Sequence, residues 1–130
     1  MSHSVLVVDD SVLMRAALKR TIEMVDVGLD DIYEAANGQE ALDFLAENTV
    51  DMILTDLNMP VMGGIELVGN LKASDDLSGI PVIVITTESS TVRIEDLQAE
   101  GIDDYLHKPF TPEEFRAVIT RNLGVCNESN

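Results

Sequence analysis

The sequence predicts an α/β fold, a doubly wound parallel sheet of five strands with five helices. Short apolar runs rich in β-branched residues recur at residues 5–8, 52–54 and 82–85, and weaker ones lie at 32–33 and 105–106. Runs that are apolar on both faces are typical of strands in a parallel sheet covered on both sides. The intervals between them, about 20 to 30 residues, each have room for one crossover helix. The expected strand starts are residues 5, 32, 52, 82 and 104.

The segment after the first run has helical periodicity. Its apolar positions form one stripe: Met14, Ala17, Leu18, Thr21, Ile22 and Val25. The charged residues Arg15, Lys19 and Glu23 fall outside this stripe. We therefore expect an amphipathic helix whose apolar face packs on the sheet.

Two helix starts carry capping boxes, in which an N-cap side chain and a carboxylate three residues later satisfy free backbone N–H groups. Asn37 with Glu40 forms one such pair, and Thr111 with Glu114 forms the other. Pro112 strengthens the second signal because proline suits the first position of a helix. We therefore expect helices to begin directly after Asn37 and Thr111.

Glycines mark two expected helix ends. Gly101 follows the expected fourth helix at residues 90–100, and Gly124 follows the fifth helix, so a left-handed C-terminal cap is expected at each. The sequence shows no break in composition. We expect one domain over residues 1–124, followed by a short polar tail at residues 125–130.

The composition favours a folded and strongly acidic domain. The 130 residues are 45% hydrophobic, with 8 Lys and Arg against 24 Asp and Glu, which gives a formal net charge of −16. A chain of this length buries roughly two-thirds of its unfolded surface, enough for a core without metal or disulfide bonds. Because so acidic a surface repels phosphates and anionic lipid headgroups, we expect no nucleic acid and no membrane among its partners.

The sequence also bears on the compartment. Cys126 is the only cysteine, so a disulfide framework is excluded and a reducing environment fits. No apolar run reaches the ~20 residues of a membrane helix, and the first residues lack the charged and apolar regions of a signal peptide. These features predict a cytoplasmic protein.

Polar side chains with useful chemistry follow the strong strands. They are Asp9 and Asp10 after the first, Asp56 after the third, Thr86 and Thr87 after the fourth, and Lys108 after the fifth. The carboxyl ends of parallel strands meet at one edge, where ligands of doubly wound sheets bind. Three carboxylates at that edge repel one another, which requires either raised pKa values or a bound cation. Mg²⁺, which keeps several waters and shares a phosphate, fits so few protein ligands better than Ca²⁺ does.

At these positions the chain resembles a response-regulator receiver domain, and over nearly its whole length it is most similar to the stand-alone chemotaxis (CheY-like) type. Asp9-Asp10 matches the acidic pair of this family, and Asp56 matches its phospho-accepting aspartate. Thr86 matches its hydroxyl, and Lys108-Pro109-Phe110 matches its Lys-Pro-Phe turn with a cis bond before the proline. Tyr105 stands at the aromatic switch position. The resemblance implies the flavodoxin-like strand order 2-1-3-4-5.

The resemblance implies that Asp56 is the phosphorylation site and that Mg²⁺ is the cofactor. Asp10, Asp56 and the backbone carbonyl of Asn58 would hold the ion, and Asp9 would act through a metal-bound water. A cation there would cancel the repulsion between the Asp56 carboxylate and an incoming anionic phosphoryl group. The donor would be a phosphohistidine on a histidine kinase, or a small acyl phosphate.

The remaining residues of the resemblance imply catalysis, switching and timing. Lys108 and Thr86 would hold phosphoryl oxygens, so catalysis would be mostly positioning and charge neutralisation. Thr86 and Tyr105 would reshape an output surface for a downstream protein, such as the flagellar motor switch. Asn58 and Glu88 would set the time of dephosphorylation by orienting a water in line with the Asp56–phosphorus bond. The expected protein is a two-component signalling switch that phosphorylates and dephosphorylates itself, and not a turnover enzyme.

Two other protein classes stay open as alternatives. A flavodoxin-like electron carrier would need a phosphate loop rich in Thr, Ser and Gly after the first strand, where this chain has Asp9-Asp10-Ser11. A haloacid-dehalogenase-type phosphatase would carry its nucleophile after the first strand and a second aspartate two residues later, where this chain has Ser11 or Val12. Bound flavin would identify the first class, and rapid turnover of small phosphomonoesters would identify the second.

Overall fold

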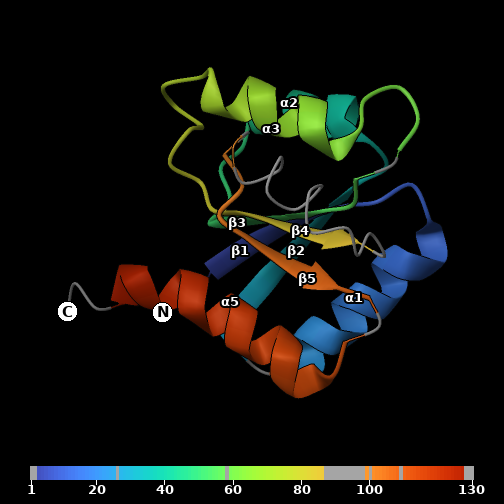
Figure 1. Cartoon of the computed structure of the whole chain (residues 1–130), viewed down its shortest axis with the longest axis vertical. Helices are drawn as coiled ribbons and strands as arrows, with labels where there is room; N and C mark the ends of the chain where they lie inside the picture. Colours follow the sequence, from blue (N-terminus) through green and yellow to red (C-terminus); the bar gives the residue numbers. More distant parts are fainter. Residues whose placement is uncertain are drawn as a thin grey trace.

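The computed structural model describes residues 3–25, 27–57, 59–86, 99, 101–108 and 110–127, with the backbone alone for Thr86 and residues 123–127. The elements in chain order are β1 (His3–Val8), α1 (Val12–Val25), β2 (Leu29–Ala35), α2 (Gly38–Leu45), β3 (Met52–Thr55), α3 (Gly64–Lys72), β4 (Val82–Thr86), β5 (Asp104–His107) and α5 (Pro112–Asn127). The strands form one parallel sheet in the order β2-β1-β3-β4-β5, so the predicted fold class and strand order are confirmed (Figure 1).

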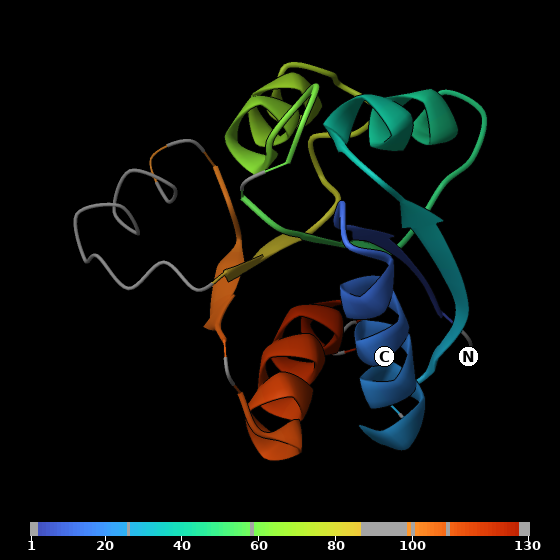
Figure 2. The same ribbon diagram turned by 90° about the vertical axis from the view of Figure 1, so that its right-hand side faces the viewer.

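Helices cover both faces of the sheet, α1 and α5 on one face and α2 and α3 on the other (Figure 2). Along β1, Val5 and Val7 belong to the core under α1 and α5, whereas Leu6 and Val8 belong to the core under α2 and α3. Because both sides of the strand are covered, β1 has no side for polar residues. This explains why its sequence is a continuous apolar run.

The predicted apolar stripe of α1 is confirmed in the C-terminal half of the helix. Leu18, Ile22 and Val25 are buried, and Met14 packs against the same core. Ala17 is exposed, so the buried stripe is narrower than the sequence predicts.

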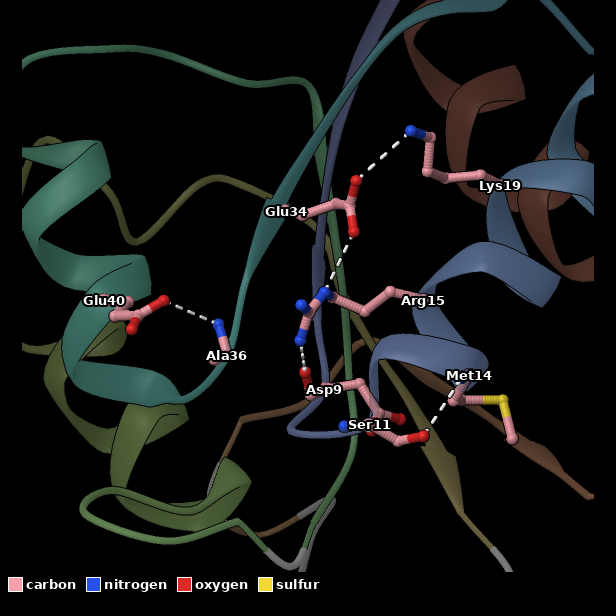
Figure 3. A network of polar contacts seen from close by, with 8 residues as sticks. All are labelled: Asp9, Ser11, Met14, Arg15, Lys19, Glu34, Ala36 and Glu40. Carbon is pink, nitrogen blue, oxygen red and sulfur yellow. Dashed lines mark hydrogen bonds and ion pairs between the residues drawn. The ribbon is translucent and has the colours of Figure 1, made fainter.

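Both predicted capping boxes are present. The backbone N–H of Glu40 donates to Oδ1 of Asn37 at 2.9 Å. The Glu40 carboxylate accepts the N–H of Ala36 at 2.8 Å, one residue earlier than expected, as Figure 3 shows. At α5, the N–H of Glu114 donates to the hydroxyl of Thr111 at 3.1 Å, and the Glu114 carboxylate accepts the N–H of Thr111 at 2.8 Å. Each box satisfies backbone donors that have no partner inside the helix.

The predicted helix ends have different outcomes. Gly101 has φ +112°, in the left-handed region expected for a glycine cap. The prediction at Gly124 is wrong, because α5 continues through Asn127 and includes the first three residues of the expected tail. Glycine costs a helix only about 1 kcal/mol relative to alanine, so it does not have to end one.

The structure describes four helices, and most of the expected fourth one, residues 90–100, lies outside the described residues; Ala99, which is described, is helical. Pro109 and the bond before it also lie outside them. In the parts of the chain that are described, no helix has the length and apolar character needed to cross a membrane.

The loop between β3 and α3 is tightly folded against the end of β3. The N–H of Gly64 donates to the carbonyl of Leu57 at 2.9 Å. A Cβ atom at Gly64 would overlap the carbonyl oxygen of Asp56, so only glycine allows α3 to begin this close to the strand. Val61 has φ +67°, the left-handed region that β-branched residues avoid, and its side chain is 80% exposed.

Candidate functional site

Three aspartates meet at the carboxyl edge of the sheet. Asp9 and Asp10 follow β1, Asp56 follows β3, and each offers one carboxylate oxygen so that the three oxygens lie within 4.8 Å of one another. β1 and β3 are adjacent strands in register, with Val8 paired to Thr55, which brings the next residues together. The structure therefore places these carboxylates in one cluster, as the strand ends predict.

Asp9 is the most firmly held member of the cluster. Only 3% of the residue is exposed. Its backbone N–H donates to the carbonyl of Ala35 on β2 at 3.0 Å, and its Oδ1 accepts the N–H of Ser11 at 2.9 Å. Its own carbonyl accepts a hydrogen bond from the guanidinium of Arg15 (Figure 3). Both the main chain and the carboxylate of Asp9 are thus fixed before any ligand arrives.

Asp56 is half-buried and is positioned by its own strand and loop. Its N–H donates to the carbonyl of Val8 at 3.0 Å, which ties it to the end of β1. Its Oδ1 accepts the N–H of Leu57 at 2.8 Å. Asp10, in contrast, is exposed at the mouth of the cluster.

Lys108 brings an ammonium group beside a carboxylate of the cluster. It follows β5, and its Nζ lies 3.7 Å from Oδ2 of Asp9, with 15% and 4% of the two side chains exposed. Like Thr86, which ends β4 and pairs with His107, it stands at the carboxyl edge predicted from the sequence. The side chain of Thr86 lies outside the described part, as do Asn58 and Glu88.

The electrostatics of the cluster are dominated by its negative charge. Burial raises the pKa of the Asp9 carboxyl above its ordinary value of 3.8, and the neighbouring charges of Asp56 and Asp10 raise it further. The hydrogen bond from Ser11 and the ammonium group of Lys108 act in the opposite direction and only partly offset the increase. Among the described residues, three carboxylates thus face one ammonium group, an arrangement that a divalent cation would relieve.

The donor set fits Mg²⁺ in its chemistry. Mg²⁺ prefers hard oxygen ligands, uses one or two carboxylates and keeps several waters. Asp10 and Asp56 are partly open to solvent, so water could complete the shell, while the buried Asp9 lies behind them. Among the described residues, the cluster offers one carboxylate oxygen from each of three aspartates, which suits an ion that keeps several of its waters.

Tyr105 lies on β5, half-buried, and packs against the core under α2 and α3. Arg15 and Glu34 are contact residues of the site that the sequence prediction did not single out. Arg15 was placed only on the polar side of its helix, and Glu34 lies 19 residues further along the chain. The only sequence signal for Arg15 is a cation one turn into the helix that follows the acidic pair.

Comparison with known proteins identifies the family. The family model described as the response regulator receiver domain matches residues 5–120. The chain belongs to the response regulator receiver domain family. CheY is itself a standard example of the strand order found here. This assignment decides against the flavodoxin-like carrier and the haloacid-dehalogenase-type phosphatase.

Relatives of this receiver domain are chemotaxis proteins. The chain is 39% identical to the chemotaxis protein CheY homolog of Campylobacter jejuni, over 92% of this chain and 91% of that one. It is 38% identical to the chemotaxis protein CheY1 of Helicobacter pylori, over 92% and 95%. The structure of the chemotaxis response regulator CheY4 of Vibrio cholerae superposes with a TM-score of 0.84 at 34% identity, covering 94% of this chain and 99% of that one. The chain is therefore a receiver domain of the CheY type, a signal-transduction domain of two-component systems.

Proposed function

We propose that this receiver domain accepts a phosphoryl group from a histidine kinase onto Asp56, with Mg²⁺ as cofactor. The observation that carries the proposal is the cluster of three carboxylates at the edge of the sheet, with the ammonium group of Lys108 beside it. Such a cluster has little structural value of its own, since its charges repel one another. A divalent cation that shares the site with a phosphoryl group would offset this repulsion, which gives the cluster a function.

Mg²⁺ would be held by Asp10, Asp56 and the backbone carbonyl of Asn58, with Asp9 acting through a water. When bound, it supplies the positive charge that allows an anionic phosphoryl group to approach a carboxylate. The buried position of Asp9, behind the exposed Asp10, is consistent with this division of roles.

The Asp56 carboxylate would be the nucleophile. Its Oδ1 is engaged by the N–H of Leu57, which leaves Oδ2 as the oxygen that attacks phosphorus. In the transfer, the bond from this oxygen to phosphorus forms while the bond from phosphorus to the histidine nitrogen breaks. The imidazole leaves with the electron pair, and the product is an acyl phosphate.

Lys108 and Thr86 would stabilise the phosphoryl oxygens. The ammonium group of Lys108, now 3.7 Å from Asp9, neutralises charge at the site, and the hydroxyl of Thr86 would add a hydrogen bond from the end of β4. The contribution of these groups is positioning and charge neutralisation of a loose transition state. Asn58 and Glu88 would orient the water that later hydrolyses the acyl phosphate.

The phosphorylated form would act on a downstream protein in the cytoplasm. Movement of Thr86 toward the phosphoryl group and of Tyr105 inward would change the surface around β5 and α5, as a shift between two packings. Chemotaxis is the favoured pathway because the relatives are chemotaxis proteins, and the flagellar motor switch is the favoured target. We assign residues 1–124 to the receiver domain and residues 125–130 to a tail, of which residues 125–127 continue α5.

The experiment is phosphorylation of the whole chain by a small acyl phosphate with Mg²⁺, followed by intact-mass measurement. One added phosphoryl group is expected, and hydroxylamine should remove it. Asp56→Asn should not be labelled, whereas the matched variant Asp75→Asn, at an exposed turn before β4, should be labelled like the wild type. Equal labelling of Asp56→Asn and the wild type would disprove the assignment of the nucleophile.

A further inference from the structure

We propose that Arg15 is a positioning residue of the metal site, which holds the peptide between Asp9 and Asp10 in the orientation that metal binding needs. The proposal rests on the Mg²⁺ site proposed above. Arg15 lies in the first turns of α1, and its side chain is 15% exposed. Figure 3 shows its guanidinium between two acceptors, the carbonyl of Asp9 and the carboxylate of Glu34.

The contact to Asp9 is made through the main chain. Nη1 of Arg15 donates to the carbonyl oxygen of Asp9, which is the carbonyl of the peptide that joins Asp9 to Asp10. Because a peptide is planar, fixing its oxygen fixes the direction in which the chain enters Asp10. Asp10 is exposed, and no described hydrogen bond holds its carboxylate. The direction of this carboxylate therefore depends on the peptide that Arg15 fixes.

The other end of the contact is anchored on β2. Nε of Arg15 lies 2.9 Å from Oε1 of Glu34, and Nζ of Lys19 lies 3.2 Å from Oε2 of the same carboxylate. The hydrogen bond from Arg15 is the largest cause that lowers the pKa of Glu34, so this anchor stays ionised. Glu34 pairs with Val7 on β1, and the next residue of β2, Ala35, accepts the N–H of Asp9. Strand β2 therefore holds both sides of residue Asp9, directly and through Arg15.

A fixed peptide matters for this particular ion. Mg²⁺ demands near-ideal octahedral geometry, so a small displacement of one carboxylate costs affinity. Removal of a residue that orients metal ligands typically lowers the metal affinity 10- to 100-fold. Arg15 fits this description. It contacts the peptide that joins Asp9 to Asp10, two of the three aspartates, and it is not one of the metal ligands itself.

Charge and position make opposite predictions for Arg15, and Lys19 provides the control. Loss of a positive charge near an acidic site should tighten the binding of a dication. Lys19→Gln also removes one positive charge that is paired with Glu34, and Lys19 makes no described contact with Asp9. Arg15→Gln removes the charge together with the hydrogen bond to the Asp9 carbonyl. A positioning role therefore reverses the sign of the effect between the two variants.

The test is titration of the whole chain with MgCl₂ alone, by calorimetry. Arg15→Gln should bind Mg²⁺ about tenfold or more weakly than the wild type. Lys19→Gln should bind it equally or slightly more tightly. Arg15→Lys, which keeps the charge and cannot span both acceptors, should also bind weakly. Binding by Arg15→Gln as tight as that by Lys19→Gln would overturn the proposal.

Two further measurements separate this proposal from the proposed function. At saturating Mg²⁺, Arg15→Gln should be phosphorylated at Asp56 like the wild type, with only the half-saturating Mg²⁺ concentration shifted upward. Labelling that is lost at every Mg²⁺ concentration would overturn a role through the metal while leaving Asp56 as the site. If Arg15→Gln does not fold, Glu34→Asp takes its place, because it keeps the negative charge and draws the carboxylate back from Arg15. This variant should also weaken Mg²⁺ binding, and unchanged affinity in it would overturn the proposal. A wild type that binds no Mg²⁺ would overturn both proposals.

Discussion

Nζ of Lys108 lies 3.7 Å from Oδ2 of Asp9, and this ion pair spans the sheet from β5 to β1 across the ends of β4 and β3. Both groups are largely buried, with 15% and 4% of their side chains exposed. The pair is thus a tertiary link between the two halves of the sheet, made at the same edge as the carboxylate cluster.

Loss of this link should destabilise the fold. Lys108→Met leaves the buried Asp9 carboxylate without its cation, and we expect the free energy of unfolding to fall by about 1 to 3 kcal/mol at neutral pH without metal. Lys72→Met is the control, because its pair with Asp103 is more exposed and should contribute less than about 1 kcal/mol. Urea denaturation of both variants gives the two values, and equal losses would contradict the special position of Lys108.

The raised pKa of Asp9 predicts how stability depends on pH in the absence of metal. Between the ordinary value of 3.8 and the higher pKa in the folded state, the folded protein binds more protons than the unfolded one. The contribution of Asp9 to stability therefore falls as the pH rises through this interval. Asp9→Asn should remove this fall and be more stable than the wild type at neutral pH, as measured by denaturation with a chelator present.

Glu34 changes the stability with the opposite dependence on pH, and over a different pH interval. Its pKa is lowered from 4.5 by Arg15 and Lys19, so its contribution is present above 4.5 and is lost as the pH falls through the lowered value. The interval assigned to Asp9 lies above 3.8 and extends upward, so a decline in stability toward neutral pH cannot come from Glu34. If the free energy of unfolding of the wild type rises from acid to neutral pH with the same slope as that of Asp9→Asn, the Asp9 assignment is contradicted.

Mg²⁺ should stabilise the folded chain, because the ion binds the assembled cluster and not the unfolded chain. At a concentration 100 times the dissociation constant, the gain is about 2.7 kcal/mol. Asp10→Asn should relieve repulsion among the carboxylates and lose this gain. Thermal melts with and without Mg²⁺ measure both effects. An unchanged melting temperature in the wild type would show that the cluster binds no Mg²⁺.

Two glycines of the same helix should respond in opposite directions to alanine. Gly64→Ala places a Cβ atom against the carbonyl oxygen of Asp56, so α3 must shift and stability should fall by more than about 1 kcal/mol. Gly69, later in α3, has open space around it, and Gly69→Ala should stabilise the protein by about 0.5 to 1 kcal/mol. Denaturation midpoints decide the matter, and a loss at both positions would mean that the helix rejects alanine for another reason.

The sequence predicts what depends on local pattern and misses what depends on distant contacts. The apolar runs of β1, β3 and β4 and the two capping boxes are local, and they were placed correctly. β2 begins at Leu29 and not at residue 32, because Asp30 and Asp31 interrupt the apolar pattern while pairing with β1 extends the strand over them. Acidic residues are tolerated there because β2 is an edge strand and they are exposed.

The same difference between local pattern and distant contacts separates the site residues that the sequence predicts from those that it misses. Asp9, Asp10, Asp56 and Lys108 stand directly after strands, so their meeting at one edge follows from the topology. Arg15 was missed because its partners are a main-chain carbonyl and a carboxylate on another element, which no spacing along the chain reveals. The roles implied for Thr86, Asn58 and Glu88 stay predictions.

Val61 offers a practical route to observing the site at work. It lies in the loop between Asp56 and α3, its side chain is 80% exposed, and its left-handed backbone does not favour valine. Neither packing nor backbone preference therefore requires valine there, and a cysteine in its place would carry a fluorescent label at little cost to folding. The native thiol of Cys126 would first be replaced by serine, since it is the only other cysteine. A dye at this position would stand a few residues from the carboxylate cluster and could report the arrival of metal or phosphate in real time.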